Sequence, residues 1–189
     1  MDKPKMGLVE TVKNSIVGAI RGAGDVGGGV VEAVSKTLVA TLEGVAEVGT
    51  SLLAAISDIV RGAIHGAVEV GGDLEAAVKG IVLGLLRGAK GAGTVTLETV
   101  GTLGSTVIKH TAEVAGDLGT AAKGLIAGVV EGAKEVGLDA TQAASAAATG
   151  ALKAAGEVSA EAGQKVRQAL TGTIAGVKVV LKEPFKKTP

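Results

Sequence analysis

Few side chains in this sequence could carry out a reaction. The chain has two histidines and no cysteine, so thiolate chemistry and cysteine-based metal sites are excluded. Neither His65 nor His110 sits in a metal-ligand spacing or beside a plausible nucleophile. We therefore expect both to be surface or groove histidines, and the sequence predicts no metal site.

The glycine-rich stretch Gly24–Gly29 has the composition of a phosphate-binding loop. It lacks the Lys-Ser/Thr pair that follows such a loop and the hydrophobic strand that precedes it. Carboxylates recur along the whole chain, so no pair is singled out for acid–base chemistry. The sequence predicts no catalytic residue and no cofactor, and we expect the protein not to be an enzyme.

Composition narrows the remaining classes of function. Basic and acidic residues number 19 each, so the formal charge is zero and no basic field favours nucleic acid. The 189 residues include 31 glycines and one Phe, with no Tyr or Trp, so the core must consist of small aliphatic side chains. No signal peptide or conventional transmembrane stretch is evident, and we expect a cytoplasmic or lipid-associated protein.

A repeat of twenty-two residues covers nearly the whole chain, and Gly66–Arg87 is its best-preserved copy. An acidic residue followed by Val returns in the same frame of most copies. These pairs are Asp25-Val26, Glu47-Val48, Glu69-Val70, Glu113-Val114, Glu135-Val136 and Glu157-Val158.

Each repeat divides into two elevens, within which apolar residues step by three, four and four. Eleven residues make three helical turns at about 3.67 residues per turn, which gives a slight right-handed drift. The pattern predicts an all-α fold in which amphipathic hendecad helices pack into a right-handed bundle, tube or filament. The predicted apolar face comprises Val26, Val48, Val70, Leu74, Val78, Ile81, Leu85, Val114, Leu118, Leu125 and Val136.

Proline occurs only at Pro4, Pro184 and Pro189, so helix breakers frame the repeats. We divide the chain into a lead-in at 1–14, a helical repeat region at 15–182 and a tail at 183–189. The unbroken phase of the repeat favours one long helix. The alternative places turns at the glycine clusters Gly27-Gly28-Gly29, Gly71-Gly72-Asp73 and Gly116-Asp117, where Asp would cap the next helix.

Glycine inside a helix costs about 0.5–1 kcal/mol relative to Ala, so its regular placement needs a reason. Small residues four apart let neighbouring helix backbones approach closely. We interpret the glycine pairs as contact positions, with flexibility or low complexity as the alternative. The predicted close-contact glycines are Gly18, Gly22, Gly62, Gly66, Gly84, Gly88, Gly128, Gly132, Gly172 and Gly176.

Charged residues follow the same frame, with basic residues on one side of the apolar stripe and acidic residues toward the other. Helices set side by side could match a basic edge to an acidic edge, although a solvated mixed-charge face is the alternative. The predicted edge residues are Lys79, Lys123, Lys134, Glu47, Glu69, Asp73, Glu113, Asp117 and Glu135.

With its eleven-residue periods and blocks such as GAKEVG at Gly132–Gly137, the chain resembles the amphipathic-repeat class of synucleins, perilipins, exchangeable apolipoproteins and group 3 late-embryogenesis proteins. That resemblance implies a helix that lies on lipid or protects membranes. This chain differs in its abundance of Gly and Val and in its zero net charge.

Three hypotheses follow from the pattern. The first is a non-enzymatic structural protein that assembles with itself through laterally packed helices, with the apolar face turned inward or toward lipid. The second is a monomeric lipid-surface coat that is disordered in water. The third is a compact solenoid of twenty-two-residue units that turn at the glycine clusters.

Overall fold

The computed structural model describes residues 4–22, 25–45, 52–91 and 95–181, and these residues form an all-α fold. The helices are α1 (Pro4–Gly22), α2 (Val26–Val45), α3 (Leu52–Glu69), α4 (Leu74–Lys90), α5 (Leu97–Glu113), α6 (Leu118–Val136), α7 (Ala140–Val158) and α8 (Ala160–Leu170). A two-stranded antiparallel hairpin follows, with β1 (Thr173–Ile174) and β2 (Val177–Lys178). Helix α1 therefore begins inside the expected lead-in, and the expected tail at 183–189 lies outside the described residues.

Short polar side chains start several of the helices. Asp73, Asp117 and Asp139 each accept a hydrogen bond from the backbone N–H three residues later, in α4, α6 and α7 respectively. Thr96 and Ser159 do the same for α5 and α8. Each cap satisfies one of the N–H groups that the first turn of a helix leaves without a backbone partner.

The prediction of many packed helices is confirmed, but the favoured single continuous helix is wrong. The chain turns after α3 at Gly71, where φ is +66°, and after α6 at Gly137, where φ is +81°. After α5 the left-handed position is occupied by Ala115, at φ +52°. The repeat kept its phase because each unit comprises a helix together with its turn, so the turns add the same number of residues each time. The cluster Gly27-Gly28-Gly29 is no turn, since it lies in the first turn of α2.

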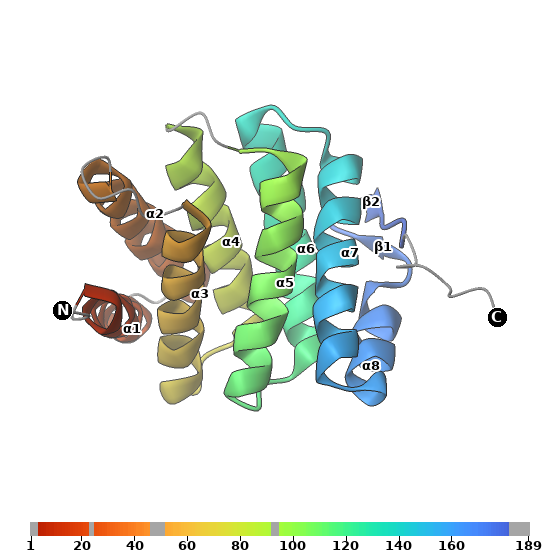
Figure 1. The fold of residues 1–189 in the computed structure, drawn as a ribbon, viewed down its shortest axis with the longest axis horizontal. Coiled ribbons are helices and arrows are strands. Elements are labelled where there is room, and N and C mark those ends of the chain that lie inside the picture. Colours follow the sequence, from red (N-terminus) through yellow and green to blue (C-terminus); the bar gives the residue numbers. More distant parts are fainter. Residues whose placement is uncertain (1–3, 23–24, 46–51, 92–94, 182–189) are drawn as a thin grey trace.

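The helices form two layers (Figure 1). Helices α1, α3, α5 and α7 follow one another in one layer, and α2, α4, α6 and α8 follow one another in the other. Each of the helices α3 to α6 packs on the helix two places earlier and on the helix two places later in the chain. The structural unit is therefore a helix pair made of two sequence repeats, and stacked pairs give an α-solenoid.

Small aliphatic side chains fill the space between the layers, as the composition requires. Of the predicted apolar face, Val78, Ile81, Leu85, Leu118 and Leu125 are buried. Val70, Leu74, Val114 and Val136 are half-buried near helix ends, while Val48 and the side chain of Val26 lie outside the described residues. None of the described helices is both long enough and apolar enough to cross a membrane.

Candidate functional site

Glycine rows set the closest approaches between stacked helices. Gly84 of α4 faces α2, and a Cβ placed on it would lie 2.7 Å from the carbonyl oxygen of Val31 and 3.0 Å from Cβ of Val34. Gly128 of α6 meets α4 in the same way, because its Cβ would lie 2.7 Å from the carbonyl oxygen of Lys79. Only a residue without a side chain allows these backbones to come so close.

The same arrangement occurs in the other layer. A Cβ on Gly62 would lie 2.5 Å from the carbonyl oxygen of Val9, and a Cβ on Gly66 would lie 2.8 Å from the carbonyl oxygen of Lys13. Helix α1 therefore packs closely against α3 at these two glycines. Gly88 and Gly132 are tight as well. Further helical glycines outside the predicted set also lie close to a neighbouring helix, and they include Gly80, Gly104, Gly124 and Gly150.

Each glycine row of α3, α4 and α6 faces the preceding helix of its layer. In α1, which begins its layer, the matching row points out of the protein. Gly18 and Gly22 stand two repeats before Gly62 and Gly66, and a Cβ on either would meet no described atom within 4 Å. They are exposed, and so are the other small residues on this side of α1, which are Gly7, Thr11 and Ser15.

The hydroxyl groups in this row already have partners. Thr11 donates to the carbonyl oxygen of Gly7 at 2.7 Å, and Ser15 donates to that of Thr11 at 2.9 Å. Such bonds to the preceding turn hold a hydroxyl against its own helix. The outer side of α1 thus carries a row of small residues, which we call the α1 small-residue face (Gly7, Thr11, Ser15, Gly18 and Gly22).

A groove of about 540 Å³ separates the outer sides of α1 and α2. Gly18 and Gly22 line it from α1, and Glu32 and Lys36 line it from α2. Lys36 donates a hydrogen bond to Glu32 at 2.6 Å, and both side chains are largely exposed. Helix α2, the first of its own layer, therefore carries charge at this end of the solenoid, whereas α1 carries small residues.

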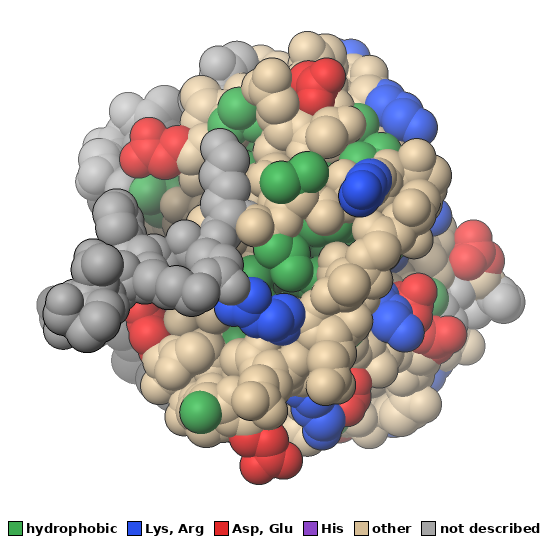
Figure 2. Space-filling model, turned by 90° about the vertical axis from the view of Figure 1, so that its right-hand side faces the viewer, with side chains coloured by type: hydrophobic (Ala, Val, Ile, Leu, Met, Phe, Trp, Pro, Cys, Tyr) green, Lys and Arg blue, Asp and Glu red, His purple; other side chains and the backbone are tan. Residues whose placement is uncertain are grey.

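The opposite end of the solenoid is covered by the chain itself. Helix α8 packs on both α6 and α7, while β1 contacts α6 and β2 contacts α7. Ser145 of α7 donates to the carbonyl oxygen of Val180 at 2.7 Å, just after β2. Figure 2 shows this side, where hydrophobic side chains form several separate areas among polar groups and backbone, with basic and acidic side chains scattered around them.

Two of the predicted contact glycines do not lie in a helix. Gly172 and Gly176 belong to the hairpin segment and have φ of +112° and +81°. A Cβ on either would meet no described atom within 4 Å. These glycines serve the left-handed backbone of the turns, because the last described helix ends at Leu170, before both of them.

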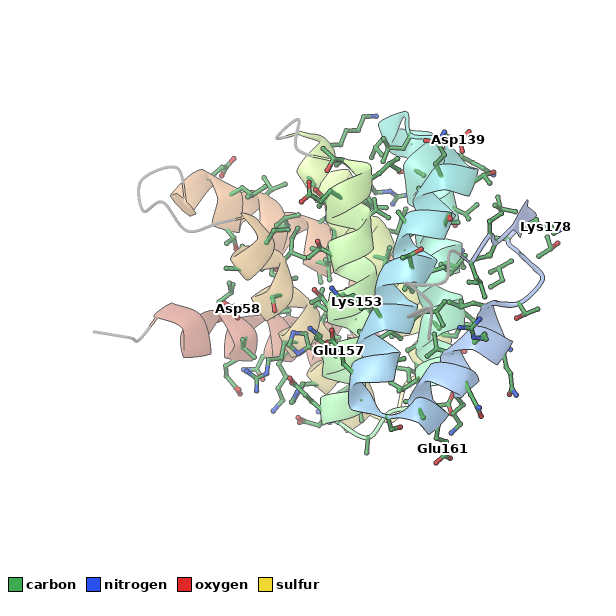
Figure 3. All side chains as sticks on the ribbon, turned by 45° about the vertical axis from the view of Figure 1, so that its right-hand side comes forward. Asp58, Asp139, Lys153, Glu157, Glu161 and Lys178 are labelled. Carbon is green, nitrogen blue, oxygen red and sulfur yellow. The ribbon has the colours of Figure 1, made fainter. Side chains whose placement is uncertain are left out.

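Ion pairs join stacked helices along their edges. Within the first layer, Lys13 meets Glu69 at 2.7 Å, Arg61 meets Glu113 at 3.4 Å, and Lys109 meets Glu157 at 3.3 Å. Figure 3 shows Glu157 on the edge of α7 beside α5. The three acidic residues are two repeats apart, so one contact recurs along the layer. In the other layer, Lys79 meets Glu131 at 2.8 Å and Arg87 binds both carboxylate oxygens of Glu135.

These contacts favour the ionised carboxylates. A hydrogen bond from Lys13 lowers the pKa of Glu69, and one from Arg87 lowers the pKa of Glu135. Asp117 has its pKa lowered by hydrogen bonds from Thr120, with Lys165 adding to the effect. Of the remaining predicted edge residues, Asp73 is a helix cap, Lys123 and Lys134 are exposed, and Glu47 lies outside the described residues.

A second groove, of about 970 Å³, runs along α5 and α7 and is lined by hydroxyl groups, including those of Thr102, Thr106 and Thr149. Each of these three side chains stands on a helix, and Thr106 and Thr149 donate to the carbonyl four residues earlier. Within the part of the chain that the structure describes, no three His or acidic residues converge as a metal site would require.

No protein family matches the sequence, and no curated protein matches it either. Among solved structures, the chain is similar to the de novo designed helical repeat protein DHR7. The two share 21% sequence identity with a TM-score of 0.55, over 87% of this chain and 91% of that one. At this identity the likeness concerns the fold, and it agrees with the stacked helix pairs.

Proposed function

We propose that this protein is a structural scaffold that pairs with a second copy of itself through the α1 small-residue face. One observation carries the proposal. Gly18 and Gly22 occupy the repeat positions at which Gly62 and Gly66 receive a neighbouring helix, yet no described residue of the same chain lies against them. A helix from another molecule would complete the contact.

Two copies meeting at this face would form a closed pair. The same patch then lies on both sides of a two-fold axis, as in most soluble homodimers. An open filament would instead need the far end of the solenoid to accept α1, and α8 and the hairpin cover that end. The asymmetry between an open first end and a covered last end therefore favours a dimer over a tube.

Charge supports this geometry. Glu32 and Lys36 flank the groove beside α1 and carry opposite charges. In a two-fold pair, Glu32 can approach Lys36 of the partner subunit, so the two charged edges match. Exposed pairs of this kind contribute about 0–1 kcal/mol each, which fixes orientation more than affinity.

The lipid-coat alternative has less support. It needs a continuous apolar face that is available to lipid, whereas the central apolar positions are buried between helices. Among the residues that the structure describes, the exposed large hydrophobic side chains belong to α2, α3, α7 and the end of the hairpin segment, and they are Val39, Leu53, Val68, Val158 and Val180.

Light scattering coupled to size-exclusion chromatography tests the proposal. We expect twice the single-chain mass of 18.3 kDa for the wild type. The double variant Gly18→Glu/Gly22→Glu should elute with the single-chain mass and unchanged helicity, because two carboxylates on each copy would face each other. Gly156→Glu, at an exposed glycine of α7 with no described atom near its Cβ position, is the matched control and should remain a dimer. A wild type with the single-chain mass at every concentration would reject the pairing.

A further inference from the structure

A polar cluster interrupts the small-residue packing between α3 and α5. His110 of α5 stands two repeats after Gly66, so an imidazole occupies a position at which the preceding helix of this layer has no side chain. Its Nε2 lies 3.1 Å from Oγ of Ser57 on α3. Its Nδ1 lies 3.1 Å from Oε2 of Glu113, one turn later on α5. The fold thus brings His110 beside the hydroxyl of Ser57, a residue 53 positions away in the sequence.

The direction of the two hydrogen bonds follows from the carboxylate. Burial raises the pKa of Glu113, but the hydrogen bond from His110 and the charges of His110, Arg61 and His65 outweigh burial, so that the pKa is lowered. The ionised carboxylate can only accept, hence Nδ1 carries the proton and donates to Glu113. In the neutral imidazole Nε2 is then the acceptor, and Ser57 donates its hydroxyl proton to it.

We propose that Ser57 is a nucleophile that takes an acyl group from small activated esters, with His110 as its general base and Glu113 as the residue that orients the imidazole. The arrangement meets the geometric requirement for an activated serine, because nucleophile and base are within hydrogen-bond reach and a third group fixes the base. This activity goes beyond the scaffold function and uses a different surface of the protein.

The reaction proceeds in two balanced steps. Oγ of Ser57 attacks the ester carbonyl carbon while its proton moves to Nε2 of His110, and the same proton then leaves with the departing alkoxide as the C–O bond breaks. Water next attacks the acyl-serine, gives one proton to Nε2 and releases the carboxylic acid as Oγ recovers that proton. His110 and Ser57 end each cycle as they began.

Two features define the substrate class. Arg61 is one helical turn beyond Ser57, half exposed, and forms an ion pair with Glu113 in which Nε lies 3.4 Å from Oε2. A guanidinium has further N–H donors, and one of them can stabilise the oxyanion that develops on the carbonyl oxygen. Ser57 is only half-buried and lines neither of the two grooves described above. Because neither of these grooves would hold a long acyl chain at Ser57, we expect the substrates to be esters with a short acyl chain and a good leaving group.

Hydrolysis of p-nitrophenyl acetate by the full chain tests the proposal, with release of p-nitrophenolate and peptide mapping by mass spectrometry as readouts. Acetyl should be found on Ser57, and Ser57→Ala and His110→Gln should each lower the protein-dependent rate by about a hundredfold, the range typical for loss of a positioned base. Glu113→Gln should lower the rate of ester hydrolysis and shift the pH dependence of that rate, because the carboxylate that orients His110 is lost.

Three controls separate this outcome from background chemistry. Ser105→Ala removes a hydroxyl that donates to the carbonyl oxygen of Gly150 and has no described histidine partner, and it should leave the rate unchanged. Thr106→Ala removes another hydroxyl, which donates to the carbonyl oxygen of Thr102, and should also have no effect. Labelling of the unmodified protein by an alkyl fluorophosphonate needs no variant and should modify Ser57. Equal rates for wild type and Ser57→Ala, or acetyl found on lysines alone, would overturn the proposal.

Discussion

Replacement of Gly84 by Ala tests the role of the glycine rows inside the fold. A methyl group here would sit 2.7 Å from the carbonyl oxygen of Val31 and 3.0 Å from Cβ of Val34. The carbonyl belongs to the backbone of α2 and cannot rotate away, so α2 and α4 must separate by a few tenths of an ångström. Overpacking of this kind costs about 1–3 kcal/mol.

The local helix preference acts in the opposite direction. Ala is favoured over Gly in a helix by about 1 kcal/mol. The expected net effect of Gly84→Ala is therefore a loss of roughly 1 kcal/mol of stability, within the range set by overpacking. The matched control is Gly156→Ala in α7, where the new methyl would meet no described atom within 4 Å and should stabilise the protein by about 0.5–1 kcal/mol.

Guanidinium unfolding followed by circular dichroism measures both changes. The two variants should move the unfolding midpoint in opposite directions while the slope of the transition stays constant. If Gly84→Ala were as stabilising as Gly156→Ala, the close approach of α2 and α4 would not exist in solution. The interpretation of the glycines as contact positions would then be refuted.

Three further outcomes are expected from the same unfolding assay. Asp117→Ala, which removes the cap of α6 and the contact with Lys165, should cost about 1 kcal/mol, and Asp117→Asn should retain most of that stability, since Asn also caps helices. Burial, with a contribution from the charge of Arg61, lowers the pKa of His65. As the pH falls below 6.5, the unfolded chain therefore takes up a proton at this residue before the folded protein does, and the stability of the fold should decrease. His65→Gln should remove this part of the pH dependence. A hydrogen bond from Lys13 lowers the pKa of Glu69. The stability that this ion pair contributes is therefore present above about pH 4.5 and is lost as the pH falls through the lower pKa that Glu69 has in the folded protein. Glu69→Gln should reduce this loss of stability at acid pH.

Much of the fold follows from the period of the sequence. The three-four-four stepping of apolar residues placed Val78 and Ile81 on one helical face, and both side chains are fully buried. The predictions failed where the period carries no information. A turn that recurs with constant length preserves the phase as well as a continuous helix does, so the period alone could not exclude either arrangement.

Local turn chemistry was the better signal for the helix ends. Asp73 and Asp117 were recognised as possible caps, and both start helices. Asp139 occupies the same repeat position and caps α7, yet it was not assigned as a break. The neighbour that each glycine row faces also depends on the tertiary structure. A helical-wheel projection of the sequence does not show whether a face contacts the preceding helix, the following helix or solvent.

The contacts of His110 could not be predicted from the sequence, because they too depend on which helices are neighbours in the fold. Ser57 and His110 belong to different helices and meet only when α3 and α5 stack. One clue was present in the sequence, since His110 interrupts the repeat at a position where Gly66 has no side chain. A residue that departs from the repeat at an inward-facing position therefore indicates a polar contact between helices.

Disulfide trapping tests the proposed pairing most directly. The natural chain has no cysteine, so Ser15→Cys introduces a single thiol at the centre of the α1 small-residue face. A disulfide needs Cα atoms within about 7 Å, so two copies can be linked only where their α1 helices cross closely. Under mild oxidation we expect Ser15→Cys to form a linked dimer rapidly, while Gly156→Cys, whose thiol would lie on α7, stays unlinked. Equal rates of linking for the two variants, or no linked dimer from Ser15→Cys, would contradict association through α1.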